Sequence, residues 1–227
     1  VILMQKPAGI SEGRNTAIAA ARAPIICVSD AGCILNPNWL KNLTEEAGPD
    51  LVVGGYSAAW ADSFLERCLA AAVVVLPEQV KEEKFMPSSR NVCFYRSAWE
   101  KVGGYPQYMD YGEDMKFNFN LIKAGYHIKF VPQAVVQWKM RASLPSIFRQ
   151  FFRYAKGDAI GRMYKMRHMI RIISLFLFIA VLALAFSLSG WILLMLVPLL
   201  AFYAWPAWRR IGAVFEGRSV IEKAAAS

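Results

Sequence analysis

The sequence predicts an α/β domain with a mixed, mostly parallel sheet, followed by a membrane-spanning region. Over the first 138 residues, short apolar runs typical of strands alternate with segments of helical spacing, and this alternation indicates an α/β fold. The 37 residues between Arg171 and Arg209 contain no charged side chain. A stretch of about 18 or more such residues is long enough to cross a bilayer.

The predicted strands and helices follow one another from the first residue. The opening run VILM, residues 1–4, is typical of a strand and has neither a starting Met nor a signal peptide before it. We therefore expect an N-terminal part of the domain to be missing. The mostly apolar run IICVSD, residues 25–30, suits a parallel strand buried on both faces. The other predicted elements are helices at 13–23, 36–47, 62–76, 97–102 and 113–123, and strands at 51–57, 91–97 and 127–138.

The uncharged segment is too long for one straight crossing. As a single helix it would extend about 55 Å, against a hydrocarbon core of about 30 Å. The sequence SLSG at residues 187–190 suits a turn at the headgroup level. We therefore predict a helical hairpin with helices at about 172–187 and 191–207, and the alternative is one strongly tilted helix.

The positive charge of the chain lies next to the predicted membrane segment. The net charge is +9, and residues 139–171 hold nine Lys or Arg against one acid, Asp158. Basic flanks mark the cytoplasmic side of a membrane. We expect an integral protein of the cell (inner) membrane, with its α/β domain and C-terminus in the cytoplasm and no nucleic-acid partner. The predicted parts are the α/β domain at 1–138, a basic amphipathic segment at 139–171, a transmembrane region at 172–208 and a basic tail at 209–227.

The cysteines and histidines do not indicate a metal site or a nucleophilic catalytic triad. The four cysteines show no CxxC spacing, and the chain has only two histidines. Reduced cysteines in a cytosolic core therefore explain the pattern better than a disulfide or a zinc site. A Ser-His-Asp hydrolase is disfavoured for the same reason.

Asp30 ends a buried strand and is followed at once by Ala31 and Gly32. In α/β sheets ligands bind at the carboxyl ends of strands, so this carboxylate is a candidate binding residue. The alternative is a turn aspartate whose oxygens are satisfied by nearby backbone amides. The residue pattern alone leaves both interpretations open.

A second acidic group, Asp110, Glu113 and Asp114, lies at the start of the predicted helix at 113–123. Acids are favoured at helix N-termini by the dipole and by free amides, so these residues are either caps or a general base. Two carboxylate sites far apart in sequence, each at the expected edge of a crevice, favour a functional role for both.

Three segments together resemble the GT-A catalytic domain of membrane-attached family-2 glycosyltransferases. They are SEGRNTAIAAARAPIICVSDAGCILNPNWL at 11–40, RNVCFYRSAWEKVGGYPQYMDYGEDMKFNFNLIKAGYHIKFVPQAVVQW at 90–138 and RQFFRYAKGDA at 149–159. The first is similar to the family stretch that leads to the D-x-D site, and the second to the acceptor-side half with its E-D pair. The third resembles the QxxRW motif of processive synthases, with Tyr in the Trp place. The resemblance covers about residues 1–160.

The resemblance implies an inverting, hexosyltransferase-type enzyme that moves a sugar from a nucleotide-diphosphate sugar to a glycan or lipid-linked acceptor in cell-envelope synthesis. Asp114, with Glu113 beside it, would take the proton from the acceptor hydroxyl. Asp30 would help hold a divalent cation, Mg or Mn, or would contact the ribose-diphosphate directly. The expected donor-binding residues are Asp30, Arg14, Asn15, Ala31 and Gly32, and the expected acceptor or sugar pocket comprises Ser88, Ser89, Arg90, Asn91, Gln150, Arg153 and Tyr154.

Two departures from the family pattern bear on these expectations. Gly32 stands where D-x-D has its second acid, so the metal would have fewer protein ligands. The strands that read the nucleotide base have no counterpart here, so we expect weak donor binding and poor folding.

The residues around 150–154 fit an amphipathic surface helix as well as a site. The alternative functions are a processive, cellulose- or hyaluronan-synthase-like enzyme and a non-catalytic membrane scaffold.

Overall fold

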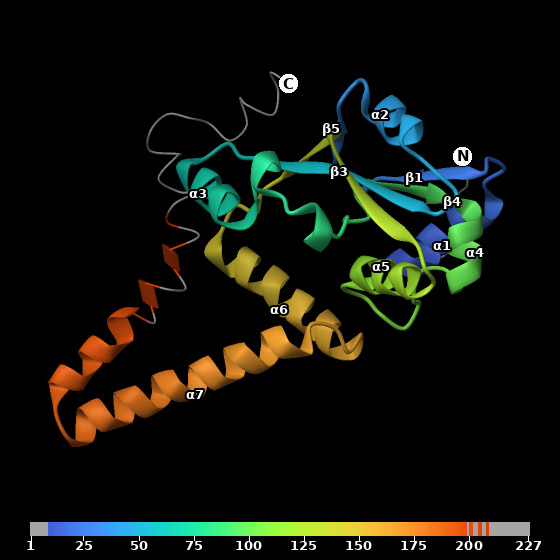
Figure 1. The fold of residues 1–227 in the computed structure, drawn as a ribbon. Coiled ribbons are helices and arrows are strands. Elements are labelled where there is room, and N and C mark those ends of the chain that lie inside the picture. The colour runs from blue at the N-terminus through green and yellow to red at the C-terminus, as the bar shows by residue number, and fades with distance from the viewer. Residues whose placement is uncertain (1–8, 199, 202–203, 206–207, 209–227) are drawn as a thin grey trace.

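The computed structural model describes residues 9–198, 200–201, 204–205 and 208, and it has a mixed α/β domain followed by two long helices (Figure 1). The predicted strand at residues 1–4 and the basic tail at 209–227 lie outside the described residues. The elements in chain order are α1 (Ile10–Ala20), β1 (Ile25–Val28), β2 (Ile34–Leu35), α2 (Trp39–Glu45), β3 (Leu51–Trp60), α3 (Phe64–Val73), η1 (Pro77–Gln79), η2 (Glu82–Lys84), β4 (Val92–Tyr95), α4 (Arg96–Val102), α5 (Glu113–Lys123), β5 (His127–Lys139), α6 (Leu144–Ile160), α7 (Lys165–Ser187) and η3 (Gly190–Met195).

The sheet has the strand order β1-β4-β3-β5-β2. The mixed α/β class is confirmed, but the prediction of a mostly parallel sheet is wrong. Among the described strands only β3 and β5 pair in parallel, whereas β4 runs antiparallel to β1 and β3, and β2 runs antiparallel to β5. An apolar run indicates a buried strand and carries no information about its direction. Here the chain reaches β4 through α3 and two short 3₁₀ turns, and it enters the sheet from the end opposite to β3.

Helices cover both faces of the sheet, and each face has its own core. Alternate residues of β3 point to opposite sides, so Val52 packs with the α1, α4 and α5 side while Val53 packs against α2. The first cluster includes Phe94, Phe117 and Tyr105, whose rings contact one another. These two packed layers hold the ends of β1 and α5 in place, and the candidate site lies there.

Helix α6 approaches the domain closely at one glycine. A Cβ atom on Gly157 would lie 2.1 Å from the carbonyl oxygen of Tyr111, so the helix packs backbone to backbone against the loop before α5. The next residue, Asp158, is buried and accepts hydrogen bonds from Arg167 at 2.5 Å and His168 at 2.9 Å. Asp158 therefore ties α6 to the first turn of α7.

Helix α7 is long and apolar enough to cross a membrane, and its most apolar stretch is unburied. It begins at Lys165, before the predicted start at residue 172, and it ends at Ser187, where the predicted turn begins. The chain then reverses direction into η3 (Figure 1). Part of the second predicted helix, residues 191–207, lies outside the described residues, so the hairpin as a whole stays a prediction.

Candidate active site

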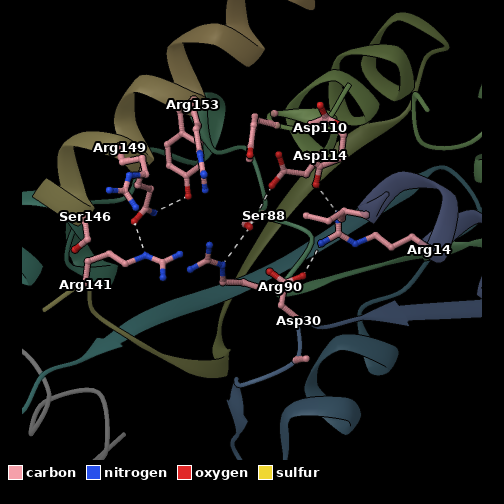
Figure 2. A pocket seen from close by; sticks show the side chains of 17 residues that line it. Arg14, Asp30, Ser88, Arg90, Asp110, Asp114, Arg141, Ser146, Arg149 and Arg153 are labelled. Carbon is pink, nitrogen blue, oxygen red and sulfur yellow. Dashed lines mark hydrogen bonds and ion pairs between the residues drawn. The ribbon is translucent and has the colours of Figure 1, made fainter. Parts of the chain in front are cut away.

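A cavity of about 570 Å³ lies between the end of β1, the N-terminus of α5 and one side of α6 (Figure 2). It brings together residues that are far apart in the sequence. Ten of the residues expected to form the site line it: Arg14, Asp30, Ala31, Ser88, Arg90, Glu113, Asp114, Gln150, Arg153 and Tyr154.

Arg14 joins the two acidic groups that the sequence identified. Its Nη2 donates to Asp30 Oδ1 at 2.5 Å, and its Nη1 donates to Glu113 Oε1 at 2.6 Å. The side chain is 14% exposed and lies 5.4 Å from the centre of the Tyr105 ring. Arg14 therefore fixes the end of β1 against the N-terminus of α5. In the unliganded site its guanidinium is paired with these two acids and is not free to bind phosphate.

Glu113 and Asp114 are adjacent in sequence but have different surroundings. Glu113 is buried, and burial is the main cause that raises its pKa, followed by the charge of Asp114. Asp114 faces the cavity, and its Oδ2 accepts from the Ser88 hydroxyl at 3.2 Å and from the Ser89 amide at 3.4 Å (Figure 2). Both side chains line the cavity, and Asp114 is the less buried of the two.

One face of α6 forms the wall opposite these acids. Ser146, Arg149, Gln150, Arg153 and Tyr154 recur at the spacing of one helix face and all line the cavity. Gln150 links this wall, because it accepts from Arg141 Nε at 3.2 Å and donates to the Tyr154 hydroxyl at 2.7 Å. The neighbouring face carries the exposed rings of Phe148 and Phe152. The site and surface-helix interpretations of this segment are therefore compatible.

Four expected site residues do not line the cavity. Asn15 is turned toward the loop after α4, where its Oδ1 accepts from Tyr105 N at 2.8 Å and from Trp99 Nε1 at 2.9 Å. Asn91 is fully buried, and Ser89 reaches the site only through its amide while its hydroxyl pairs with Tyr105. Gly32 lies in the turn after Asp30 with φ +85°. These residues position the site, because their polar groups are used inside the protein or in a turn.

Asn91 shows how a polar residue can be mistaken for a binding residue. Its amide nitrogen donates to the carbonyl oxygens of Tyr56 at 2.8 Å and Ala134 at 2.7 Å, and its oxygen accepts from Trp39 Nε1 at 2.8 Å. The side chain thus joins β3, β5 and α2. Nothing in the local sequence distinguishes such a buried crosslink from a pocket residue.

The sequence interpretation missed several residues that line the cavity. Tyr111, Arg141 and Ser146 were not predicted, and Arg149 was assigned only to the membrane-facing charge. A signal for the residues on α6 was present, because Ser146 and Arg149 share the helical spacing of Gln150 and Arg153. Arg141 lies outside that helix, and only the fold brings it to the cavity.

The part of the chain that the structure describes offers a single carboxylate, that of Asp30, for a divalent cation at the end of β1. The described residues contain no group of three or more His, Cys, Asp or Glu side chains that could hold a metal ion. Asp30 already accepts from Arg14, and Gly32 supplies no second carboxylate. Magnesium is commonly bound by one or two carboxylates together with substrate phosphates and waters, so one carboxylate is compatible with an ion shared with a diphosphate. That Asp30 holds Mg or Mn stays a prediction.

Comparison with known proteins gives both sequence and structural matches. A sequence profile described as "Glycosyl transferase family group 2" matches residues 46–215. Over 62 residues the chain is 36% identical to "Succinoglycan biosynthesis protein ExoA" of Rhizobium meliloti (strain 1021). That match covers 27% of this chain and 19% of the relative, so it spans about a fifth of the relative's length.

Two solved glycosyltransferase structures are also similar. The crystal structure of GalNAc-T7 with UDP, GalNAc and Mn²⁺ gives a TM-score of 0.47 at 13% identity, covering 70% of this chain and 36% of that one. The mannosyltransferase PcManGT from Pyrobaculum calidifontis, in complex with GDP-Man and Mn²⁺, gives 0.49 at 18% identity, covering 69% and 43%. The family assignment does not depend on them. Because the profile matches more than half of its 227 residues, the chain belongs to glycosyl transferase family group 2.

Proposed function

We propose that this chain catalyses inverting transfer of a hexosyl group from a nucleotide-diphosphate sugar to an acceptor hydroxyl, with Asp114 as the general base. The observation that carries the proposal is the position of Asp114 at the N-terminus of α5, facing a cavity of about 570 Å³. Among the described residues it forms no ion pair with Lys, Arg or His, and two serine groups orient one of its oxygens. A carboxylate oriented in this way can accept a proton.

The reaction needs one base and a stabilised leaving group. The acceptor oxygen attacks the anomeric carbon from the side opposite the diphosphate, and Asp114 takes the hydroxyl proton as the new bond forms. The diphosphate leaves with the bonding electron pair and needs no acid, because it is a good leaving group. Glu113 positions the site through Arg14 and holds α5 against β1, so its role is distinct from that of Asp114.

The donor and the acceptor would occupy the two sides of the cavity. Asp30 and Ala31 would contact the donor at the end of β1, and Ser88 and Arg90 would face the sugar. Gln150, Arg153 and Tyr154 would complete the acceptor side on α6. The cavity lining supports a common site for donor and acceptor, because these residues share one space.

We place the acceptor among lipid-linked or cell-envelope glycans and the chain in the inner membrane, with its catalytic domain and C-terminus in the cytoplasm. Helix α7 supports this proposal through its length and apolar character, and so do the exposed phenylalanines of α6. The basic residues between Lys139 and Arg171 support the cytoplasmic side.

The test measures nucleoside diphosphate release from a panel of nucleotide sugars by the full chain in detergent. Asp114→Asn should lower kcat about 10²- to 10⁴-fold, the range for loss of a general base. Asp50→Asn is the matched control, because Asp50 is exposed, lies outside the cavity and should keep full activity.

The product's anomeric configuration, read by NMR, tests inversion. Equal turnover by wild type and Asp114→Asn would refute the base assignment. No turnover with any donor would favour a non-catalytic scaffold.

A further inference from the structure

Two hydrogen bonds in series connect Arg90 to the proposed base. Arg90 Nε donates to the Ser88 hydroxyl at 3.3 Å, and that hydroxyl donates to Asp114 Oδ2 at 3.2 Å (Figure 2). A guanidinium has donors but no acceptor, so the Ser88 oxygen can only accept from it. The one proton of the hydroxyl is therefore directed to Asp114, whereas a serine without such a neighbour could rotate its proton to another acceptor.

Trp138 holds Arg90 in this position. The Arg90 guanidinium lies 4.5 Å from the centre of the Trp138 ring, near the end of β5. A cation over an indole face is attracted by the ring, and this attraction limits the conformations that the long side chain takes. Because Nε makes the contact with Ser88, the terminal nitrogens of Arg90 can still face the sugar.

The segment that carries Ser88 is fixed to the helix that carries Asp114. Asn118, one turn further along α5, donates from Nδ2 to the carbonyl oxygen of Pro87 at 2.7 Å. The carbonyl oxygen of Ser88 accepts from the amide of Asn91 at 2.9 Å, and the buried Asn91 side chain joins this segment to β3 and β5. The backbone at Ser88 is therefore held on both sides, and its hydroxyl is the part that can still rotate.

The two oxygens of Asp114 are held by different parts of the fold. Oδ1 accepts from the amide of Met115 at 2.8 Å, within α5, and Oδ2 accepts from Ser88 and from the Ser89 amide. In the part of the chain that the structure describes, the Arg90 guanidinium reaches this carboxylate through a hydroxyl and not through an ion pair. A substrate hydroxyl therefore does not have to displace a cation from the base.

We infer that Arg90 is a positioning residue that, through Ser88, orients Asp114 for proton transfer. This inference rests on the proposed transferase function. As the acceptor oxygen bonds to the anomeric carbon, its proton passes to Asp114, and the diphosphate leaves with the electron pair of the broken bond. Arg90 and Ser88 keep their own protons. A base held in the reactive orientation lowers the barrier of the chemical step, so the effect should fall on kcat rather than on KM.

Steady-state kinetics of the full chain in detergent, with a donor that wild type turns over, test the order of these contacts. Ser88→Ala and Arg90→Met should each lower kcat about 10-fold, the size expected for one hydrogen bond to a charged group. Added to Ser88→Ala, Arg90→Met should lower kcat by less than about twofold more, because the hydroxyl through which it acts is gone. Trp138→Leu should lower kcat about 2- to 5-fold, the size of one cation–π contact, and only when Ser88 is present.

Three further variants separate positioning from a general loss of structure. Ser88→Thr keeps the hydroxyl and should restore kcat to within about threefold of wild type. Arg67→Gln is the matched control for the lost charge, because Arg67 is exposed on α3 and lies outside the cavity, and it should keep the wild-type kcat. Ser88→Ala should have no further effect in Asp114→Asn, because the serine acts through that carboxylate. Each kcat is divided by the folded fraction, read from thermal unfolding.

Additive losses of kcat in Ser88→Ala and Arg90→Met would overturn the inference, because Arg90 would then act on the substrate itself. A rise in KM with unchanged kcat would overturn it too, and so would a Ser88→Thr variant as slow as Ser88→Ala. In each of these cases, turnover that depends on Asp114 would leave the transferase function standing. Absence of turnover with every nucleotide sugar would instead refute the transferase function and, with it, the catalytic role of Arg90.

Discussion

Removing the Arg14 guanidinium tests the link between the two acidic groups. Replacement by Met keeps most of the volume of the side chain and deletes its charge. Glu113, which is 8% exposed as a side chain, is then left as a buried carboxylate without its partner. Loss of one partner of a buried ion pair costs about 3–5 kcal/mol, so the change should be strongly destabilising.

The expected destabilisation by Arg14→Met follows from the two ion pairs that Arg14 forms, which differ in exposure. Asp30 is 37% exposed as a side chain, so its pair with Arg14 adds only about 0–1 kcal/mol. The total for Arg14→Met should therefore be about 3–6 kcal/mol. In a chain of 227 residues this corresponds to a fall of about 6–24 °C in the unfolding temperature. Glu113→Gln should cost less, because Arg14 keeps its contact with Asp30.

A double-mutant cycle measured by thermal unfolding is the assay. Wild type, Arg14→Met, Glu113→Gln and the double variant should give a coupling free energy of at least about 2 kcal/mol, because the two residues are in direct contact. Additivity within about 0.5 kcal/mol would refute the reasoning, since it would show that the ion pair contributes nothing.

The pH dependence of the stability of wild type and Arg14→Met gives a second check on the role of the ion pair. Burial raises the pKa of Glu113 above its usual value, so its contribution to stability is present below the unfolded pKa and is lost as pH rises through the folded pKa. Removing Arg14 should raise that pKa further. The stability gap between wild type and Arg14→Met should therefore be smaller at pH 5 than at pH 8, and a gap that stays constant would contradict this account.

Three further predictions concern packing and buried polar groups. Gly157→Ala should destabilise the protein by about 3 kcal/mol, because the new Cβ would overlap the carbonyl oxygen of Tyr111, while Gly13→Ala, whose Cβ meets nothing within 4 Å, should be neutral or stabilising in thermal unfolding. Asn91→Ala should cost about 3 kcal/mol or more in the same assay, because three hydrogen bonds are lost in a buried place, and an unchanged unfolding temperature would contradict this. Asp158→Asn should loosen α7 from α6, seen as faster hydrogen exchange at the start of α7, and unchanged exchange there would show that the ion pairs do not hold the two helices together.

Most of the local structure could be predicted from the sequence. The helix at 113–123 is confirmed to the residue, and Gly125, the glycine that predicted its end, follows with φ +95°. The strand signals at 25–30 and 127–138 also correspond to β1 and β5. These elements are predictable because their signals, apolar spacing and glycine positions, lie within about ten residues of one another.

The arrangement of the site was less predictable, because it depends on contacts between distant residues. Arg14 and Glu113 are 99 positions apart, and no local pattern shows that one guanidinium holds both acids. Asn15 and Asn91 resemble pocket residues in sequence, yet tertiary contacts satisfy their side chains. The direction of β4 also depends on the path of its connection rather than on its own residues.

The turn at Gly32 bears on how the site could change in evolution. A Cβ atom there would meet nothing within 4 Å, and aspartate tolerates the left-handed backbone region better than most residues. The fold therefore leaves room for the missing acid, and one base change converts a glycine codon into one for aspartate or glutamate. A lineage could pass between a site with one carboxylate and a site with two without rebuilding the loop.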